Sequence, residues 1–106
     1  MVTIDDFRKL ELCVAQIKEV REHPNADRLY VLKIDLGHEE RQLVAGIRKA
    51  YSPQELIGKR VVIIKNLEPA TIRGETSQGM LLAASDENGL AVLTPDKEIA
   101  LGGRVS

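Results

Sequence analysis

The sequence predicts an all-β domain of the Greek-key barrel or sandwich type. Short apolar strand patterns follow one another along the chain, with turn signals between them. One short helix signal interrupts them near the middle, and strands do not alternate with long helices, which excludes a doubly wound parallel sheet. With 106 residues and no linker or internal repeat, we expect one domain over residues 1–106.

The N-terminal part predicts a helical turn and a long first strand. Residues 5–10 place acids before bases, as the dipole of a short helix favours. A strand is expected over residues 12–20, and its apolar spacing slips from two to three between Val14 and Ile17. That slip predicts a β-bulge at this point of the strand.

The next two strands are expected to form a hairpin over residues 28–36 and 41–47. Gly46 lies inside the second of them and suggests a bulge or a close backbone approach. One face of the first strand is apolar at every second position, at Tyr30, Leu32, Ile34 and Leu36.

The clearest local signal is a helix start at residues 52–55. Ser52 is expected to cap the helix, Pro53 to take its first position and Glu55 to complete a capping box. Leu56 and Ile57 are expected to pack inward. A short helix between strands 3 and 4 is typical of a five-stranded OB-fold barrel.

The second half alternates apolar segments with polar ones. Residues 65–80 form a polar stretch with two glycines, which we expect to be a binding loop held between core strands. Asn88-Gly89 predicts a type I′ hairpin turn. The apolar segments of this half, expected to be strands and a short tail, are residues 61–64, 80–84, 90–93 and 99–105.

Charge and composition permit a nucleic-acid partner without demanding one. The formal net charge is −1, but residues 58–80 carry four basic and two acidic side chains, whereas residues 81–106 carry two and four. No apolar run is long enough to cross a membrane, and the N-terminus lacks the pattern of a signal peptide. We therefore expect a cytoplasmic protein without a membrane partner.

Catalytic and metal-binding signatures are missing. The single cysteine, Cys13, is expected to be core filler, and it leaves His23 and His38 without the ligand spacing of a zinc site. Phosphate-binding glycine motifs do not occur. We therefore expect no enzyme activity of the chain alone, no catalytic residues, no metal and no cofactor.

Four segments together resemble a known family. Residues 23–30 (HPNADRLY), 43–47 (LVAGI), 65–69 (KNLEP) and 73–80 (RGETSQGM) are similar to the tRNA-binding domain at the C-terminus of methionyl-tRNA synthetases. The same module resembles free-standing tRNA-binding proteins and a cytokine-precursor module of the animal synthetase complex. The resemblance implies an OB-fold that binds tRNA by shape, without catalysis, and assists aminoacylation beside a synthetase catalytic region. It also implies a homodimer formed through a C-terminal extension, here about residues 86–106, although this tail could simply cover the end of the barrel.

The polar stretch supplies the groups that an RNA-binding site needs. Guanidinium and ammonium groups bind phosphates, while carboxamides bind base edges or 2′-hydroxyls. Met80 could instead belong to the core, Asn66 could be a turn former, and Lys33 could be an ordinary surface lysine. The predicted RNA-binding residues are Lys33, Lys65, Asn66, Arg73, Ser77, Gln78 and Met80.

Few aromatic residues are available to stack bases. The chain has only Phe7, Tyr30 and Tyr51, so shape recognition of a folded RNA fits better than reading of a single strand. Two alternatives stay open. One is a peptide-binding protein like the secretion chaperones that share this module, and the other is a purely structural dimerisation domain.

Overall fold

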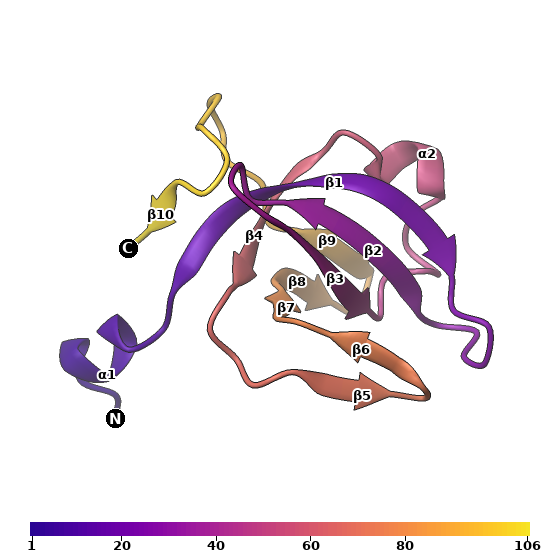
Figure 1. Ribbon diagram of the computed structural model, residues 1–106, viewed down its shortest axis with the longest axis horizontal. Coiled ribbons are helices and arrows are strands. Elements are labelled where there is room, and N and C mark those ends of the chain that lie inside the picture. Colours follow the sequence, from indigo (N-terminus) through magenta and orange to yellow (C-terminus); the bar gives the residue numbers. More distant parts are fainter.

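The computed structural model describes residues 1–106 and shows a nearly closed barrel of antiparallel strands, which confirms the predicted all-β, OB-like architecture (Figure 1). The strand order of the main sheet is β3-β2-β1-β4-β7, and β10 pairs with β1 beside this path. Two further hairpins, β5–β6 and β8–β9, extend from it. The elements are α1 (Ile4–Arg8), β1 (Leu12–Glu22), β2 (Tyr30–Asp35), β3 (Glu40–Ala45), α2 (Pro53–Leu56), β4 (Arg60–Ile64), β5 (Ala70–Ile72), β6 (Glu75–Ser77), β7 (Met80–Leu81), β8 (Ala83–Asp86), β9 (Gly89–Val92) and β10 (Arg104–Val105).

Strand β1 is the centre of the barrel because it pairs with three partners. Its second half pairs with β2, and its first half pairs with β4 and, through residues 12–13, with β10. The register with β2 shifts between Ile17 and Glu19, so the bulge lies at Lys18 and not between Val14 and Ile17. The predicted position is wrong because both faces of residues 12–15 are buried, which removes the alternation on which it depended.

The core lies inside the barrel, on the alternate positions that the sequence marked in β2. Tyr30, Leu32, Ile34 and Leu36 are all buried. Cys13 is a buried free thiol in the same cluster, as expected. The remaining large core side chains come from β1, β3, β4 and α2, namely Ile17, Leu43, Leu56, Val61 and Ile63.

Helix α2 begins as predicted but buries one side chain instead of two. The carboxylate of Glu55 accepts hydrogen bonds from the backbone N–H and the hydroxyl of Ser52, at 2.8 and 3.0 Å. Leu56 is fully buried, whereas Ile57 is 53% exposed. The prediction for Ile57 is wrong because the helix ends at Leu56, and the extended backbone of Ile57 directs its side chain outward.

Two turn predictions in β-structure also need correction. Strand β3 ends at Ala45, so Gly46 lies in the bend after the strand and forms no bulge within it. The β8–β9 hairpin exists, but Glu87 and Asn88 form its turn, and neither has a positive φ. The carboxylate of Asp86 accepts from the N–H groups of the turn and so stabilises it without a type I′ geometry.

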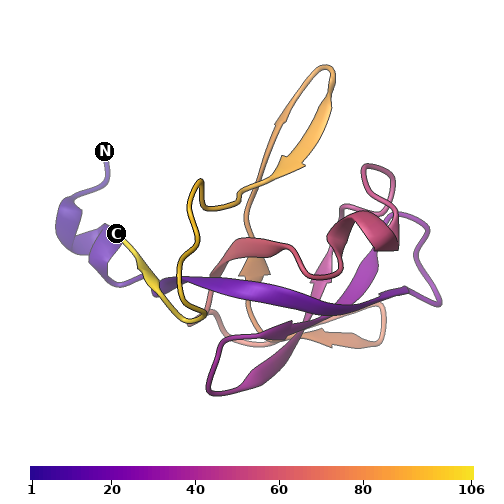
Figure 2. The ribbon, with the colours of Figure 1, turned by 90° about the horizontal axis from the view of Figure 1, so that it is seen from above.

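The C-terminal part contributes a projecting hairpin and a returning tail. The β8–β9 hairpin extends away from the barrel (Figure 2). The tail then returns to β1, where the Gly102 N–H donates to the Val14 carbonyl at 2.7 Å and the Val14 N–H donates to Gly103. No helix in the structure is long and apolar enough to span a membrane.

Candidate functional site

A shallow hollow of about 470 Å³ lies on the outer face of the β1–β2–β3 sheet. Strand pairing aligns Glu19, Lys33 and Gln42 in one row across the three strands. The next outward row begins with Arg21 and Val31. Three cations, four carboxamide or carboxylate groups and three aliphatic side chains line the hollow, and no aromatic ring does. Its lining residues are Glu19, Val20, Arg21, Val31, Leu32, Lys33, Glu40, Arg41, Gln42 and Gln78.

The polar stretch at residues 65–80, which contributes Gln78 to the wall of this hollow, is more ordered than the predicted loop. It contains the β5–β6 hairpin, whose two-residue turn is formed by Arg73 and Gly74. Both have positive φ, 50° and 92°, as a type I′ turn requires. The sequence did not reveal this turn because arginine rarely adopts a positive φ.

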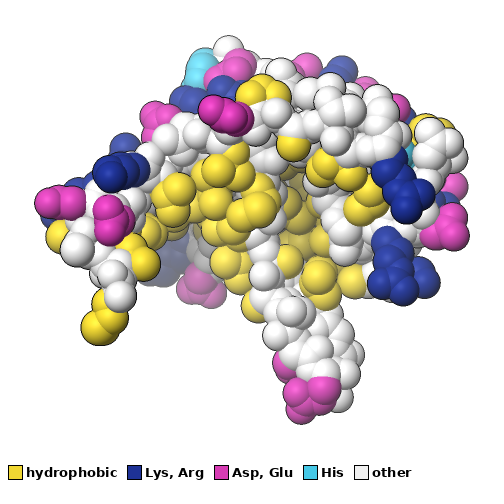
Figure 3. All heavy atoms as spheres, turned by 90° about the horizontal axis from the view of Figure 1, so that it is seen from below, with side chains coloured by type: hydrophobic (Ala, Val, Ile, Leu, Met, Phe, Trp, Pro, Cys, Tyr) yellow, Lys and Arg dark blue, Asp and Glu magenta, His cyan; other side chains and the backbone are white.

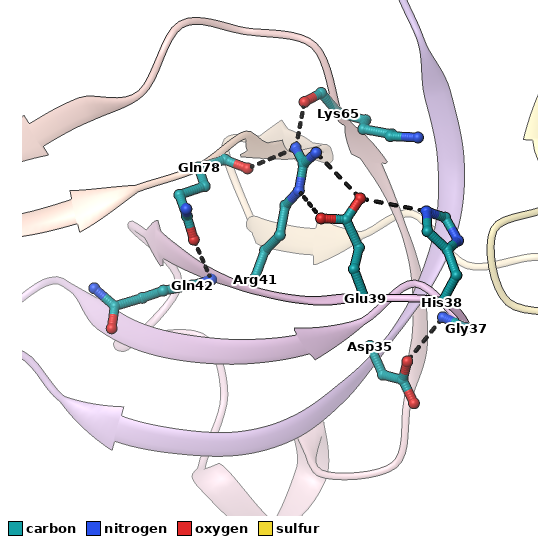
Figure 4. Close-up of polar contacts among 8 residues, drawn as sticks. All are labelled: Asp35, Gly37, His38, Glu39, Arg41, Gln42, Lys65 and Gln78. Atoms are coloured by element: carbon teal, nitrogen blue, oxygen red, sulfur yellow. Dashed lines mark hydrogen bonds and ion pairs between the residues drawn. The ribbon is translucent and has the colours of Figure 1, made fainter.

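Arg41 connects both ends of that stretch to β3 (Figure 4). Its guanidinium donates to the carbonyl of Lys65 at 2.6 Å and to the carbonyl of Gln78 at 3.4 Å. It also donates to both carboxylate oxygens of Glu39, at 3.1 and 3.3 Å. This hydrogen bonding holds the pKa of Glu39 below its ordinary value and keeps the pair charged.

Ser77 and Gln78 close the barrel against β3. The Gln78 N–H donates to the Gln42 carbonyl at 2.8 Å, and the Gln42 N–H donates to the side-chain Oε1 of Gln78 at 3.1 Å. The Ser77 hydroxyl accepts from the Val44 N–H and donates to the Gly79 carbonyl, both at 3.0 Å. Ser77 is only 4% exposed, so we assign its hydroxyl a structural role in barrel closure.

A second set of polar contacts attaches the β5–β6 hairpin to the sheet. Arg21 lies 2.7 Å from the carboxylate of Glu75, and the side chain of Gln42 donates to the Thr76 carbonyl at 2.8 Å. The hydrogen bond from Arg21 lowers the pKa of Glu75. The hairpin therefore stays against the face that carries the hollow.

Asn66 lies at the opposite end of the stretch and is engaged within the protein. Its carboxamide accepts from the Glu11 N–H at 2.8 Å and donates to the Lys9 carbonyl at 2.7 Å. Its side chain therefore connects the segment after β4 to the junction between α1 and β1. One amide hydrogen is left for an external partner.

The other predicted residues are exposed but lie in different places. Lys33 borders the hollow and lies 3.7 Å from Glu19 and 3.9 Å from Glu40, so two carboxylates partly neutralise it. Met80 is 45% exposed on β7, which places its side chain outside the core. The structure therefore brings Lys33 and Gln78 to one hollow and separates them from the remaining predicted residues.

Arg21, Arg41 and Gln42 are the residues of this face that sequence reasoning missed. All three lie at outward or edge positions of strands, where polar side chains are ordinary. Nothing in the sequence spacing links them to the stretch at residues 65–80, since their partners are at least 24 positions away. No group of three or more His, Cys, Asp or Glu side chains is arranged to hold a metal ion.

Comparison with known proteins identifies the family. The family model "Putative tRNA binding domain" matches residues 12–104. A methionine–tRNA ligase from Thermococcus kodakarensis is 62% identical over 104 residues, which are 98% of this chain but 14% of that protein. The chain thus spans a small part of the length of the curated relatives it matches.

Two solved structures share the whole fold. A MetRS-related protein from Pyrococcus horikoshii has a TM-score of 0.93 at 34% identity, with 100% of this chain and 98% of that chain covered. The CsaA chaperone protein from Picrophilus torridus has a TM-score of 0.93 at 32% identity, with 100% of both chains covered. The match of the family model to residues 12–104 confirms the resemblance seen in the four sequence motifs, and the chain therefore belongs to the tRNA-binding domain family.

Proposed function

We propose that this chain is a non-catalytic tRNA-binding module that assists aminoacylation as the C-terminal domain of a methionyl-tRNA synthetase. The family match over residues 12–104 carries the proposal. The relatives named methionine–tRNA ligase support the parent enzyme, and their much greater length supports a role as one part of it. Such a module acts in the cytoplasm, where aminoacylation takes place.

The hollow on the β1–β2–β3 face is the proposed RNA surface. Arg21 and Arg41 are held by contacts within the chain, so Lys33 is the cation of the hollow that can meet a phosphate. The carboxamides of Gln42 and Gln78 suit ribose hydroxyls. No aromatic side chain lines it, so contacts to backbone and ribose replace base stacking. The ion pairs of Lys33 with Glu19 and Glu40 weaken its attraction for phosphate and favour a modest affinity per subunit.

Lys65 and Arg73 flank this face as cations that form no ion pair within the chain. Their charges are therefore available to RNA phosphates. Because each phosphate contact releases counterions, binding is expected to weaken as salt rises. Arg73→Ala should lower tRNA affinity by about threefold to tenfold and make the salt dependence shallower.

Fluorescence anisotropy with a labelled tRNA at two salt concentrations tests the proposal. An unstructured RNA of equal length should bind more weakly, since shape is what the module recognises. Lys97→Gln removes a cation that forms no ion pair, from the segment between β9 and β10, where it does not line the sheet-face hollow, and serves as a charge-matched control. Absence of tRNA binding by the unmodified chain would refute the proposed function.

We also propose that two copies associate through an apolar surface on the outside of β4, β7 and the β8–β9 hairpin. Apolar side chains gather beside the projecting hairpin when the molecule is seen from below (Figure 3). Met80 and Leu93 are 45% and 41% exposed, and Leu93 is hydrogen-bonded through its backbone to Val62 and Leu82. The tail covers its own β1, so the hairpin is better placed than the tail to meet a second copy.

Sedimentation equilibrium tests this assembly. Leu93→Glu should convert a dimer into monomers, because a buried unpaired carboxylate is costly. Ile57→Glu is a matched control, since Ile57 is also an exposed aliphatic residue but follows α2, away from the hairpin. A monomeric unmodified chain, or a Leu93→Glu variant that stays dimeric, would contradict the proposed dimer surface.

The chaperone alternative follows from the fold shared with CsaA proteins, and it would use exposed apolar surface in place of cations. A chaperone-like protein should suppress aggregation of an unfolded client, and Arg73→Ala should leave this activity unchanged. A module that binds tRNA through charge should lose binding in the same variant. Running both assays on one set of variants separates the two functions.

A further inference from the structure

A second hollow lies beyond the sheet face, between the β1–β2 connection and the tip of the β5–β6 hairpin. Its volume is about 390 Å³, and its lining residues are Asn25, Ala26, Asp27, Arg28, Leu29 and Arg73. Both walls lie at the same end of the barrel (Figure 1). Of the residues proposed above as RNA contacts, only Arg73 lines this second hollow.

Hydrogen bonds from His23 and Arg73 hold the two walls together. The ring of His23 is 3% exposed, and its Nδ1 accepts from the Asn25 N–H at 3.0 Å. Because an amide N–H can only donate, the proton of the neutral ring lies on Nε2, which donates to the Ile72 carbonyl at 2.9 Å. Arg73 adds a bond from its guanidinium to the Asn25 carbonyl at 3.0 Å.

The residues that line the hollow carry several donors that have no partner in the chain. The backbone N–H groups of Ala26, Asp27 and Arg28 find no acceptor in the protein. The guanidinium of Arg28 forms no ion pair or hydrogen bond, and that of Arg73 forms only its bond to Asn25. The lining of the hollow thus contains two cations and a single carboxylate, that of Asp27.

The backbone at Arg73 also indicates a role for its side chain. A φ of 50° is unfavourable for a bulky residue, and glycine or asparagine would fit the first position of this turn better. Strain of this kind is typical of functional positions. Here it places a guanidinium at the rim of a donor-rich hollow.

We infer that this hollow is a phosphate-binding site, formed by the side chains of Arg28 and Arg73 and by the backbone N–H groups of residues 26–28. The inference rests on the proposed function, because the phosphate would be a phosphodiester of an RNA that extends past the sheet face. Guanidinium forks and backbone N–H groups together match the oxygens of a phosphate. Arg28 thus becomes an RNA contact, and Asp27 opposes binding.

Three single-charge variants test the inference by tRNA anisotropy across a salt series. Arg28→Gln should weaken binding by about threefold to tenfold and reduce the slope of log K against log salt by about 1. Asp27→Asn removes the opposing carboxylate, which has no partner in the chain, and should strengthen binding by about twofold to threefold. Lys97→Gln should bind as the unmodified chain does.

A titration with inorganic phosphate, followed by the backbone amide resonances of ¹⁵N-labelled protein, probes the site without RNA. The amides of residues 26–28 should shift in the unmodified chain and much less in Arg28→Gln. If Arg73→Ala weakens tRNA binding but Arg28→Gln matches Lys97→Gln, the site is refuted while the proposed function stands. If tRNA does not bind at all, the proposed function fails, and the phosphate shifts alone then support the anion site or, if absent, overturn it.

Discussion

Arg41→Met removes the guanidinium that connects β3 to both ends of the stretch at residues 65–80. Methionine has a similar length and keeps the apolar stem, so the change isolates the polar contacts. The side chain of Arg41 is 21% exposed, and its carbonyl partners belong to Lys65 and Gln78. We expect the variant to fold, with lower stability and a looser binding wall.

The expected loss of stability follows from the two hydrogen bonds that Arg41 donates to backbone carbonyls. A hydrogen bond of this kind contributes about 1 kcal/mol to the free energy of unfolding, and the 3.4 Å bond to Gln78 contributes less than the 2.6 Å bond to Lys65. The ion pair with Glu39 adds little to this free energy, because its carboxylate is exposed to solvent. A total of about 1–2 kcal/mol corresponds to a drop in Tm of about 5–15 °C for a domain of this size.

Calorimetry and amide hydrogen exchange measure the two effects. Exchange should accelerate most at Gln78, whose N–H closes the barrel against β3, and tRNA affinity should fall. The salt slope should stay unchanged, because Arg41 positions the wall and contacts no phosphate.

Arg60→Met is the matched control. Its side chain is 29% exposed, donates to the Ile99 carbonyl and lies 3.8 Å from Glu98. It should lower Tm without changing exchange at Gln78. If Arg41→Met melts like the unmodified chain and exchanges at the same rate, the connecting role of Arg41 is refuted.

Three further outcomes follow from contacts at the same wall. Arg21→Gln should destabilise the protein at neutral pH but not in strong acid: the lowered pKa of Glu75 gives stability that is present above the ordinary glutamate value, about 4.3, and is lost as pH falls through the lowered value. Thermal melts from about pH 6 to about pH 2.5 check this, and equal losses at both ends would contradict it. Ser77→Ala should cost about 1–3 kcal/mol in urea unfolding, because it leaves the buried Val44 N–H unpaired, whereas Thr76→Ala at the exposed neighbour should cost much less. Asn66→Ala should accelerate amide exchange around residues 9–11, and unchanged exchange there would exclude the connection that Asn66 makes.

The fold was predictable because its signals are local. The alternation of apolar residues in β2 predicted which face of this strand points into the core. The residues Ser52, Pro53 and Glu55 predicted where helix α2 begins. The errors occur where tertiary context overrides local pattern. Residues 12–15 are all buried, and the tail pairs with β1 at residues 12–13, so their apolar spacing did not indicate the bulge at Lys18.

The candidate site was predictable in its location and less so in its chemistry. The sequence marked residues 65–80, and the structure places that stretch beside the hollow, with Gln78 on its lining. The sequence did not show that the side chains of Ser77 and Asn66 form hydrogen bonds with backbone groups 33 and 55 positions away. Such pairings depend on barrel closure, which no residue spacing within one segment encodes.

Barrel closure and binding depend on the same residues in this domain. Gln78 closes the barrel through its backbone and its Oε1 atom, yet its side chain also lines the hollow proposed for RNA. Its NH₂ group has no partner within the chain, so it can donate to a 2′-hydroxyl while Oε1 stays bound to β3. Gln78→Glu keeps the acceptor and replaces the donor with a charge that repels phosphate. It should therefore lower tRNA affinity at a nearly unchanged Tm, the combination that separates an RNA contact from a residue needed only for closure.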